Sequence, residues 1–116
     1  MSIERQAEIL PELREAVSAF LYPLKTTSEV KKEAFARLEA IAAEATRICK
    51  ADALLSKALL AEIFIATRAI EPEEEYVAVE DRAALCGMRQ KLDVLFYLLL
   101  KGESPEERLP GVPRVV

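Results

Sequence analysis

The feature that most constrains this chain is a stretch of more than 40 residues, 24–71, that contains neither glycine nor proline. Apolar residues recur along it at alternating spacings of four and three, which is typical of one face of an α-helix with about 3.6 residues per turn. Alanine, leucine, glutamate, lysine and arginine dominate the composition. These residues favour helix because they lose little side-chain entropy in it. The sequence therefore predicts an all-α fold.

Two further amphipathic segments flank this stretch. In residues 3–22, glutamates lie opposite an apolar face, and Gln6 is the only polar member of that face. Pro11 should kink or restart this helix, and Pro23 should end it. The last segment, 72–101, begins with acidic residues around a proline and ends at a glycine, as helices commonly do.

The long stretch allows two architectures. It can form one helix more than about 60 Å long at 1.5 Å per residue. Alternatively, it breaks near residues 50–52, with Asp52 as the N-cap of the following helix. Its own start is indicated by Thr26 and Glu29, which have the spacing of a capping box, although Thr27 or Ser28 could also be the N-cap. A single long helix would leave its far half unpaired in a monomer, so we favour the break.

We therefore predict an antiparallel four-helix bundle. The expected helices lie near residues 3–22, 27–49, 53–70 and 72–101, and the alternative is a three-helix arrangement with one long central helix. Short connections should make sequential helices antiparallel neighbours. Residues 1–103 form the bundle and 104–116 an extended C-terminal tail. Gly87, in the middle of the last helix, should allow a neighbouring helix to approach closely.

Composition excludes several classes of function. The net charge is −4 and no clustered basic run is present, so we expect no nucleic-acid partner. The most apolar run, 94–100, is too short to span a bilayer, and the N-terminus lacks the apolar region of a signal peptide, so we expect a cytoplasmic protein without a membrane partner. The chain has no histidine, which removes histidine-based metal sites and nucleophile pairs. Cys49 and Cys86 have no metal-ligand spacing, and no cofactor is expected.

Three acidic residues fall on core-facing positions of the helices when the sequence is projected at 100° per residue. They are Asp52, Glu62 and Asp81. An unpaired buried charge is costly, so each needs an explanation. The simpler one is a cation from a neighbouring helix, or a position at a bundle end where water reaches the carboxylate. The other is a carboxylate cluster that binds a divalent metal or performs acid–base chemistry, which would make the protein a small hydrolase or a metal-binding bundle.

Two segments are more apolar than one core-facing stripe requires: residues 54–66 and 94–100. Such a surplus is typical of a surface used for self-association or for a partner helix. The candidate interface residues are Leu60, Phe64, Val94, Phe96, Tyr97, Leu98 and Leu100. The leading hypothesis is a non-enzymatic protein that acts through protein–protein contacts, as a regulator, adaptor, chaperone or immunity-type protein, and that forms a homo-oligomer, most simply a homodimer.

Overall fold

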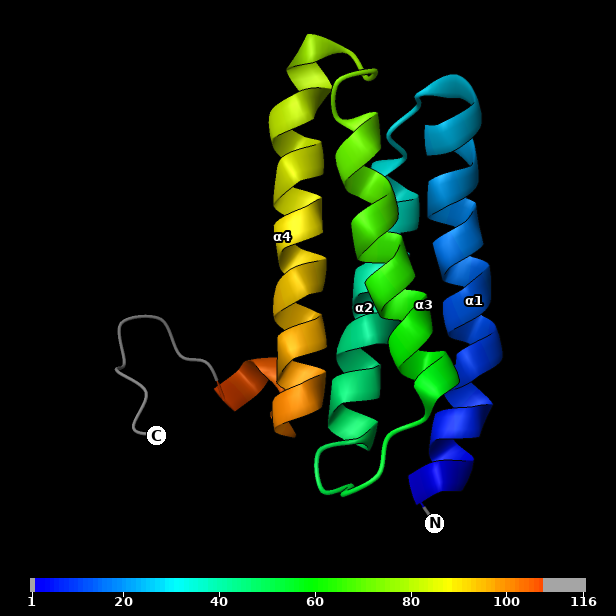
Figure 1. The fold of residues 1–116 in the computed structure, drawn as a ribbon, viewed down its shortest axis with the longest axis vertical. Helices are drawn as coiled ribbons and strands as arrows, with labels where there is room; N and C mark the ends of the chain where they lie inside the picture. The colour runs from blue at the N-terminus through cyan, green and yellow to red at the C-terminus, as the bar shows by residue number, and fades with distance from the viewer. Residues whose placement is uncertain (1, 108–116) are drawn as a thin grey trace.

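The computed structural model describes residues 2–107 and is a four-helix bundle (Figure 1). The elements are α1 (Ser2–Thr27), α2 (Lys32–Ile48), α3 (Lys57–Ile70), a 3-10 turn η1 (Glu71–Glu73), α4 (Val79–Lys101) and a 3-10 turn η2 (Pro105–Glu107). The predicted all-α four-helix bundle is confirmed. The alternative with one long central helix is wrong, because residues 49–56 interrupt the helix between α2 and α3.

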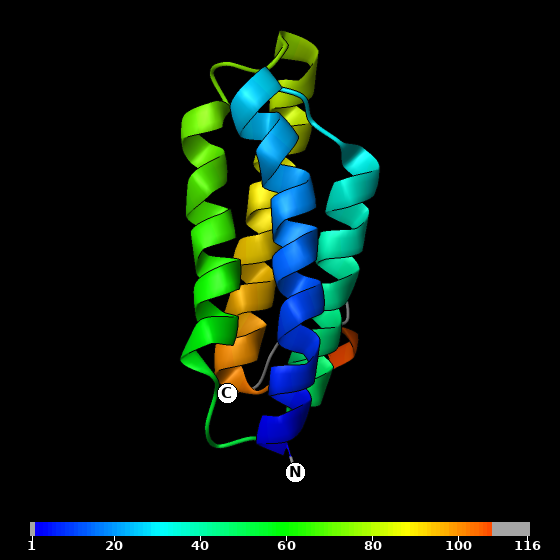
Figure 2. The same ribbon diagram turned by 90° about the vertical axis from the view of Figure 1, so that its right-hand side faces the viewer.

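The four helices stand at the corners of a square, and the connection from α2 to α3 crosses its diagonal (Figures 1 and 2). α1 packs against α2 and α3, and α4 packs against the same two helices. The pairs α1–α2 and α3–α4 are antiparallel, whereas α1 runs parallel to α3 and α2 parallel to α4. The expectation that sequential helices are neighbours therefore holds for two pairs and is wrong for α2 and α3.

The core is a single apolar cluster drawn from all four helices. Its largest fully buried side chains include Phe20, which meets Phe35 edge-on with the ring centroids 5.3 Å apart. The others are Leu13, Leu24, Leu38, Leu59, Ile63, Ile70, Leu85, Leu92, Leu98 and Leu99. These positions recur at helical spacing along each element, which explains why the periodicity predicted the fold.

The crossing loop is fastened to α1 by one buried amide side chain. Gln6, which is 0% exposed, donates from Nε2 to Asp52 Oδ2 (2.8 Å) and to the backbone oxygen of Leu54 (3.0 Å). Its Oε1 accepts a hydrogen bond from the backbone N–H of Ser56 (2.7 Å). The only polar residue on the apolar face of α1 is thus explained by three hydrogen bonds to the loop, which satisfy polar groups that would otherwise lack partners.

The first helix does not restart at Pro11, and the prediction that it ends at Pro23 is wrong. α1 continues past Pro11 and Pro23 and ends only at Thr27. Ser28 then takes a left-handed conformation, with φ of 56°. The backbone N–H of Glu29 bonds to the oxygen of Pro23 (3.2 Å) and closes the last turn. A proline inside a helix costs one backbone hydrogen bond. At Pro23 the tertiary packing of the helix offsets that loss, so the helix does not end there.

The N-caps of α2 and α3 were also predicted wrongly. α2 begins after Lys31, which offers no side-chain cap, so the spacing of Thr26 and Glu29 does not form a capping box. α3 is capped by Ser56, whose hydroxyl oxygen accepts a hydrogen bond from the backbone N–H of Leu59 (3.3 Å). Asp52, the predicted cap, lies four residues earlier in the loop, where Gln6 holds it.

The connection between α3 and α4 is longer than predicted. The segment that begins at Glu71 forms η1 and a turn instead of the start of a long helix, and α4 begins at Val79. Arg89 on α4 reaches back to this connection, where its Nε donates to Glu74 Oε2 at 2.7 Å. Its Nη1 lies 3.9 Å from Glu71 Oε2. These ion pairs hold the connection against the first half of α4.

After α4 the chain turns back onto the end of α2. Gly102 takes a left-handed conformation (φ 71°), and the N–H groups of residues 102 and 103 bond to carbonyls of the last helical turn, which is a Schellman cap. Arg47 on α2 donates to Glu106 Oε1 at 2.7 Å, and Lys50 forms an ion pair with Glu107. The first residues of the predicted tail are therefore held beside the end of α2, and the remainder, 108–116, lies outside the described residues.

Candidate interaction surfaces

An aromatic surface lies on the α3–α4 pair, beside the first half of α3 and the last two turns of α4. It consists of Leu60, Phe64, Phe96, Tyr97 and Leu100. Leu60 and Phe64 are four positions apart on α3, and Leu100 follows Phe96 by four positions and Tyr97 by three on α4, so each of these pairs shares one side of its helix. The rings of Phe64 and Phe96 join the two helices, with the centroids 5.8 Å apart. Five of the seven predicted interface residues thus lie around the Phe64–Phe96 contact on α3 and α4.

The patch contains large apolar side chains that are about half exposed. Phe64 is 50% exposed, Tyr97 46% and Leu100 54%, whereas Leu60 and Phe96 are partly buried against the core. Single exposed apolar residues are common on protein surfaces, whereas a group of them that includes aromatic rings is a candidate for an interaction surface. Aromatic residues are also enriched at the centre of protein–protein interfaces.

Charges of both signs border the aromatic surface. The guanidinium of Arg68 lies 6.0 Å from the centroid of the Phe64 ring. Asp93, on α4, precedes Phe96 by one helical turn and is exposed. Within residues 2–107, neither Arg68 nor Asp93 takes part in an ion pair. The patch therefore has an apolar centre and a charged rim, which is the usual composition of a protein interface.

The other two predicted interface residues lie elsewhere. Leu98 is 1% exposed and belongs to the core, since residues 103–105 fold back beside it. It is therefore not on a free surface. Val94 is 46% exposed but faces α2 instead of α3, because it lies two positions from Phe96 on the helix.

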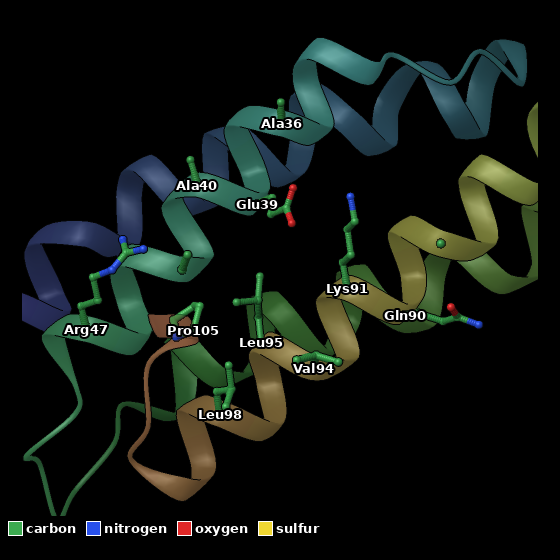
Figure 3. Close-up of a pocket in the computed structure, with 12 residues that line it drawn as sticks. Ala36, Glu39, Ala40, Arg47, Gln90, Lys91, Val94, Leu95, Leu98 and Pro105 are labelled. Atoms are coloured by element: carbon green, nitrogen blue, oxygen red, sulfur yellow. The ribbon is translucent and has the colours of Figure 1, made fainter. Parts of the chain in front are cut away.

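Val94 lines an open groove between α2 and α4 (Figure 3), which we call the α2–α4 groove. Its volume is about 700 Å³. The walls are small residues, and the floor is apolar: Ala36, Ala40 and Ala43 on α2, and Gly87, Val94, Leu95 and Leu98 on α4. Glu39 and Lys91 extend into the space between the helices from opposite sides. Pro105 lies at one end of the groove, beside Arg47 and Leu98.

The missing side chain of Gly87 explains part of this opening. The prediction that a neighbouring helix approaches Gly87 closely is wrong. A Cβ built at Gly87 would have no heavy atom within 4 Å, so no neighbouring helix approaches it closely. Sequence reasoning did not find the groove. The signal was present in the spacing of Ala36, Ala40 and Ala43, three small residues on one side of α2. Small residues at this spacing also fit close helix packing, so the sequence did not distinguish a groove from a contact.

The three acidic residues that were considered as a cluster do not come together. Asp52 lies in the crossing loop at one end of the bundle, and Asp81 lies in the first turn of α4 at the other (Figure 1). Glu62 lies between them on α3, where its Oε2 is 3.6 Å from Arg14 Nε on α1. In the part of the chain that the structure describes, no three acidic or cysteine side chains are grouped so that they could hold a metal ion.

The ion pair of Glu62 should contribute little to stability. The side chains of Arg14 and Glu62 are 56% and 25% exposed, so water screens the attraction between them. If one of the two charges is removed by substitution, water solvates the other. We expect Glu62→Ala to lower the free energy of unfolding by less than about 1 kcal/mol, instead of the 3–5 kcal/mol typical of a buried pair. Urea denaturation measures this, with the exposed acid variant Glu12→Ala as the control. A loss above 3 kcal/mol would mean that Glu62 is buried in solution.

The two cysteines are free thiols in different surroundings. Cys86 is partly exposed, and Arg89 Nη2 lies 3.5 Å from its sulfur. Cys49 is 1% exposed. Burial, together with the nearby Asp52 carboxylate, raises the pKa of Cys49 to about 11, so this thiol is neutral at physiological pH and carries no nucleophilic chemistry.

The raised pKa of Cys49 predicts a loss of stability in alkali. Below pH 9, the ordinary value, the thiol is protonated in both the folded and the unfolded chain. Between pH 9 and 11 the unfolded chain loses this proton first, so stability falls by about 2 kcal/mol over the interval. Urea denaturation of the wild type and of Cys49→Ala at pH 8 to 11 isolates the effect. Parallel pH profiles for the two proteins would contradict it.

Comparison with known proteins gives this chain no relative: no protein-family model, no curated protein and no solved structure matches it. Among the described residues, none of the helices combines the length and the apolar character needed to cross a membrane. The surfaces themselves are therefore the basis for proposing a function.

Proposed function

We propose that this protein acts through protein–protein contacts and not as an enzyme, and that it binds a second copy of itself through the aromatic surface. The observation that carries the proposal is the patch around the Phe64–Phe96 contact, with three large apolar side chains about half exposed. Covering these side chains removes apolar area from water, which is the main driving force of protein association.

The charged rim favours a second copy as the partner. Phe64 and Phe96 lie at the same level of two antiparallel helices. Arg68 is four residues beyond Phe64 on α3, and Asp93 is three residues before Phe96 on α4, so both lie about 5 Å toward the same end of the bundle. A two-fold axis parallel to the helices places α3 of one copy on α4 of the other. Arg68 of each copy then lies level with Asp93 of its partner, which makes the surface self-complementary.

Sedimentation velocity over 1–100 µM tests this proposal. We expect the wild type to be a dimer and Leu100→Asp, a charge at the apolar centre, to be a monomer. The single variants Arg68→Asp and Asp93→Arg should each weaken dimerisation about tenfold or more, because like charges then face each other. The double variant, Arg68→Asp with Asp93→Arg, should restore it, since the opposite charges have only changed places.

The control is Tyr22→Asp, which places a charge on an exposed aromatic residue of α1, away from the surface (71% exposed). It should dimerise like the wild type. Circular dichroism melts confirm that each variant is folded. A wild type that is monomeric at 100 µM would overturn the proposal, as would charge-swap variants that behave no differently from Tyr22→Asp.

A further inference from the structure

The α2–α4 groove extends along most of α2. A second hollow of about 480 Å³ continues it toward Lys32. The two hollows share the lining residues Ala36, Glu39, Gly87 and Lys91. Arg47, at the far end, follows Lys32 by fifteen residues, which is about 22 Å of helix. The continuous space between α2 and α4 is therefore as long as about four turns of a helix.

Each wall of the groove presents one row of residues at helical spacing. On α2 the row is Ala36, Ala40, Ala43 and Arg47, and on α4 it is Gly87, Lys91, Val94 and Leu98. Both rows have spacings of four, three and four residues, and α2 and α4 run parallel. Alanine and glycine let a neighbouring backbone approach closely. A third helix can therefore pack between the two rows, as helices pack in bundles.

The occupant of this space has to satisfy its own backbone. The walls are helices, so their backbone groups are already bonded within α2 and α4, and most of the lining residues are apolar. An extended segment would leave N–H and C=O groups without partners against these walls, whereas a helix bonds them internally. The geometry therefore favours an amphipathic helix with its apolar side on Leu95 and Leu98.

Two opposite charges specify the flanks of that helix. Glu39 extends into the groove from α2, and Lys91 extends into it from α4 (Figure 3). Within residues 2–107, neither of these side chains takes part in an ion pair. Arg47, by contrast, is already paired with Glu106. A helix in the groove matches these charges when a basic residue lies on its α2 flank and an acidic residue on its α4 flank.

A second copy of this chain fits the groove less well than a helix from another protein. The apolar stripe of each described helix is already buried in the core, so a second copy has no free helix to place in the groove. A two-fold axis would bring groove against groove, and two concave surfaces leave the space between them unfilled.

We infer that the α2–α4 groove binds an amphipathic helix of a partner protein. This helix is about 15 residues long, and its apolar stripe is flanked by a basic residue beside Glu39 and an acidic residue beside Lys91. The inference goes beyond the proposed dimer, because the groove lies between α2 and α4 and the aromatic surface lies on the α3–α4 pair.

Synthetic helical peptides of about 16 residues serve as probes. Fluorescence anisotropy measures their binding to the full-length chain. All carry the same stripe of leucine and alanine. The mixed peptide has lysines on one flank and glutamates on the other, and two comparison peptides have glutamates or lysines on both flanks. The mixed peptide should bind most tightly. The other two should bind about tenfold more weakly, because each places a like charge against Glu39 or Lys91.

Reversing one wall charge should change which peptide is preferred. Glu39→Lys makes both walls basic, so the peptide with glutamates on both flanks should become the tightest ligand. Lys91→Glu makes both walls acidic and should favour the peptide with lysines on both flanks. Glu12→Lys makes the same change of net charge at an exposed position of α1 and should leave the preference for the mixed peptide unchanged.

Filling the groove should block the peptide. Gly87→Leu adds a side chain without a clash, since the Cβ position is open. It should weaken binding of the mixed peptide about tenfold or more. Ala19→Leu adds comparable bulk at an exposed position of α1 and should have no effect. Leu100→Asp, in the aromatic surface, should also bind like the wild type, which distinguishes a failure of the dimer from a failure of this inference.

Melting curves show whether each variant is folded. Equal affinities of the three peptides for the wild type and both wall-charge variants would overturn the inference, as would a folded Gly87→Leu protein that binds the mixed peptide as tightly as Ala19→Leu does. Amide shifts at Gly87 that depend on protein concentration in the absence of peptide would also overturn it, because a second copy would then be the occupant.

Discussion

Replacing Phe20 by alanine is expected to lower the free energy of unfolding by about 3–5 kcal/mol, the range for removing a buried aromatic ring from a core. Phe20 is 0% exposed and packs edge-on against Phe35, so the variant loses both the burial of its own ring and the contact between helices α1 and α2. Chemical denaturation monitored by circular dichroism measures the loss.

Tyr22→Ala provides the matched comparison. It removes an aromatic ring from the same helix, two residues away, but at a site that is 71% exposed. Its effect should stay within about 0.5 kcal/mol. If both variants lost the same stability, Phe20 would not be in the core.

Replacing Gln6 by leucine should cost about 2–4 kcal/mol, although the substitution adds apolar surface to an apolar site. The leucine leaves three groups of the crossing loop without their partner: the Asp52 carboxylate, the Leu54 carbonyl and the Ser56 N–H. The loss should be accompanied by faster amide exchange at Ser56, because its N–H is no longer bonded.

Gln90→Leu is the control for this substitution. It exchanges the same side chains at an exposed position of α4 and should change stability by no more than about 0.5 kcal/mol. A Gln6→Leu protein as stable as the wild type, with unchanged exchange at Ser56, would show that the loop does not depend on this amide.

The architecture could be predicted from the sequence because one physical rule governs most of it. Apolar residues at helical spacing identify the four helices and many of the buried positions, including Leu13, Leu38, Leu59 and Leu92. The helix ends were predicted less well. Thr26 and Glu29 have the spacing of a cap, yet Thr26 lies in the last turn of α1 and α2 begins only after Lys31.

The connectivity could not be obtained in the same way. A bundle in which α2 and α3 are adjacent and one in which they are diagonal require the same apolar spacing. The diagonal loop is held by Gln6, whose partners are 46 to 50 residues away in the sequence. The sequence identified Gln6 as unusual but contained no sign of its partners.

The candidate interface was predicted in part for a similar reason. Periodicity placed Phe64, Tyr97 and Leu100 outside the core stripe, where they are exposed, whereas Phe96 is partly buried against the core. It placed Leu98 there as well, but Leu98 is buried because the chain turns at Gly102 and folds back beside it. A helical projection contains only the helix and cannot include a later segment that covers it.

The diagonal crossing also divides the molecule into two halves. α1–α2 and α3–α4 are each hairpins of sequence neighbours, and residues 49–56 are the one covalent link between them. A chain cut in this link would leave both hairpins whole and would remove only the tether that keeps them at high local concentration. Two separately produced chains, one with α1–α2 and one with α3–α4, should therefore reassemble into the bundle. Gln6 on the first chain would bind the loop residues at the cut end of the second.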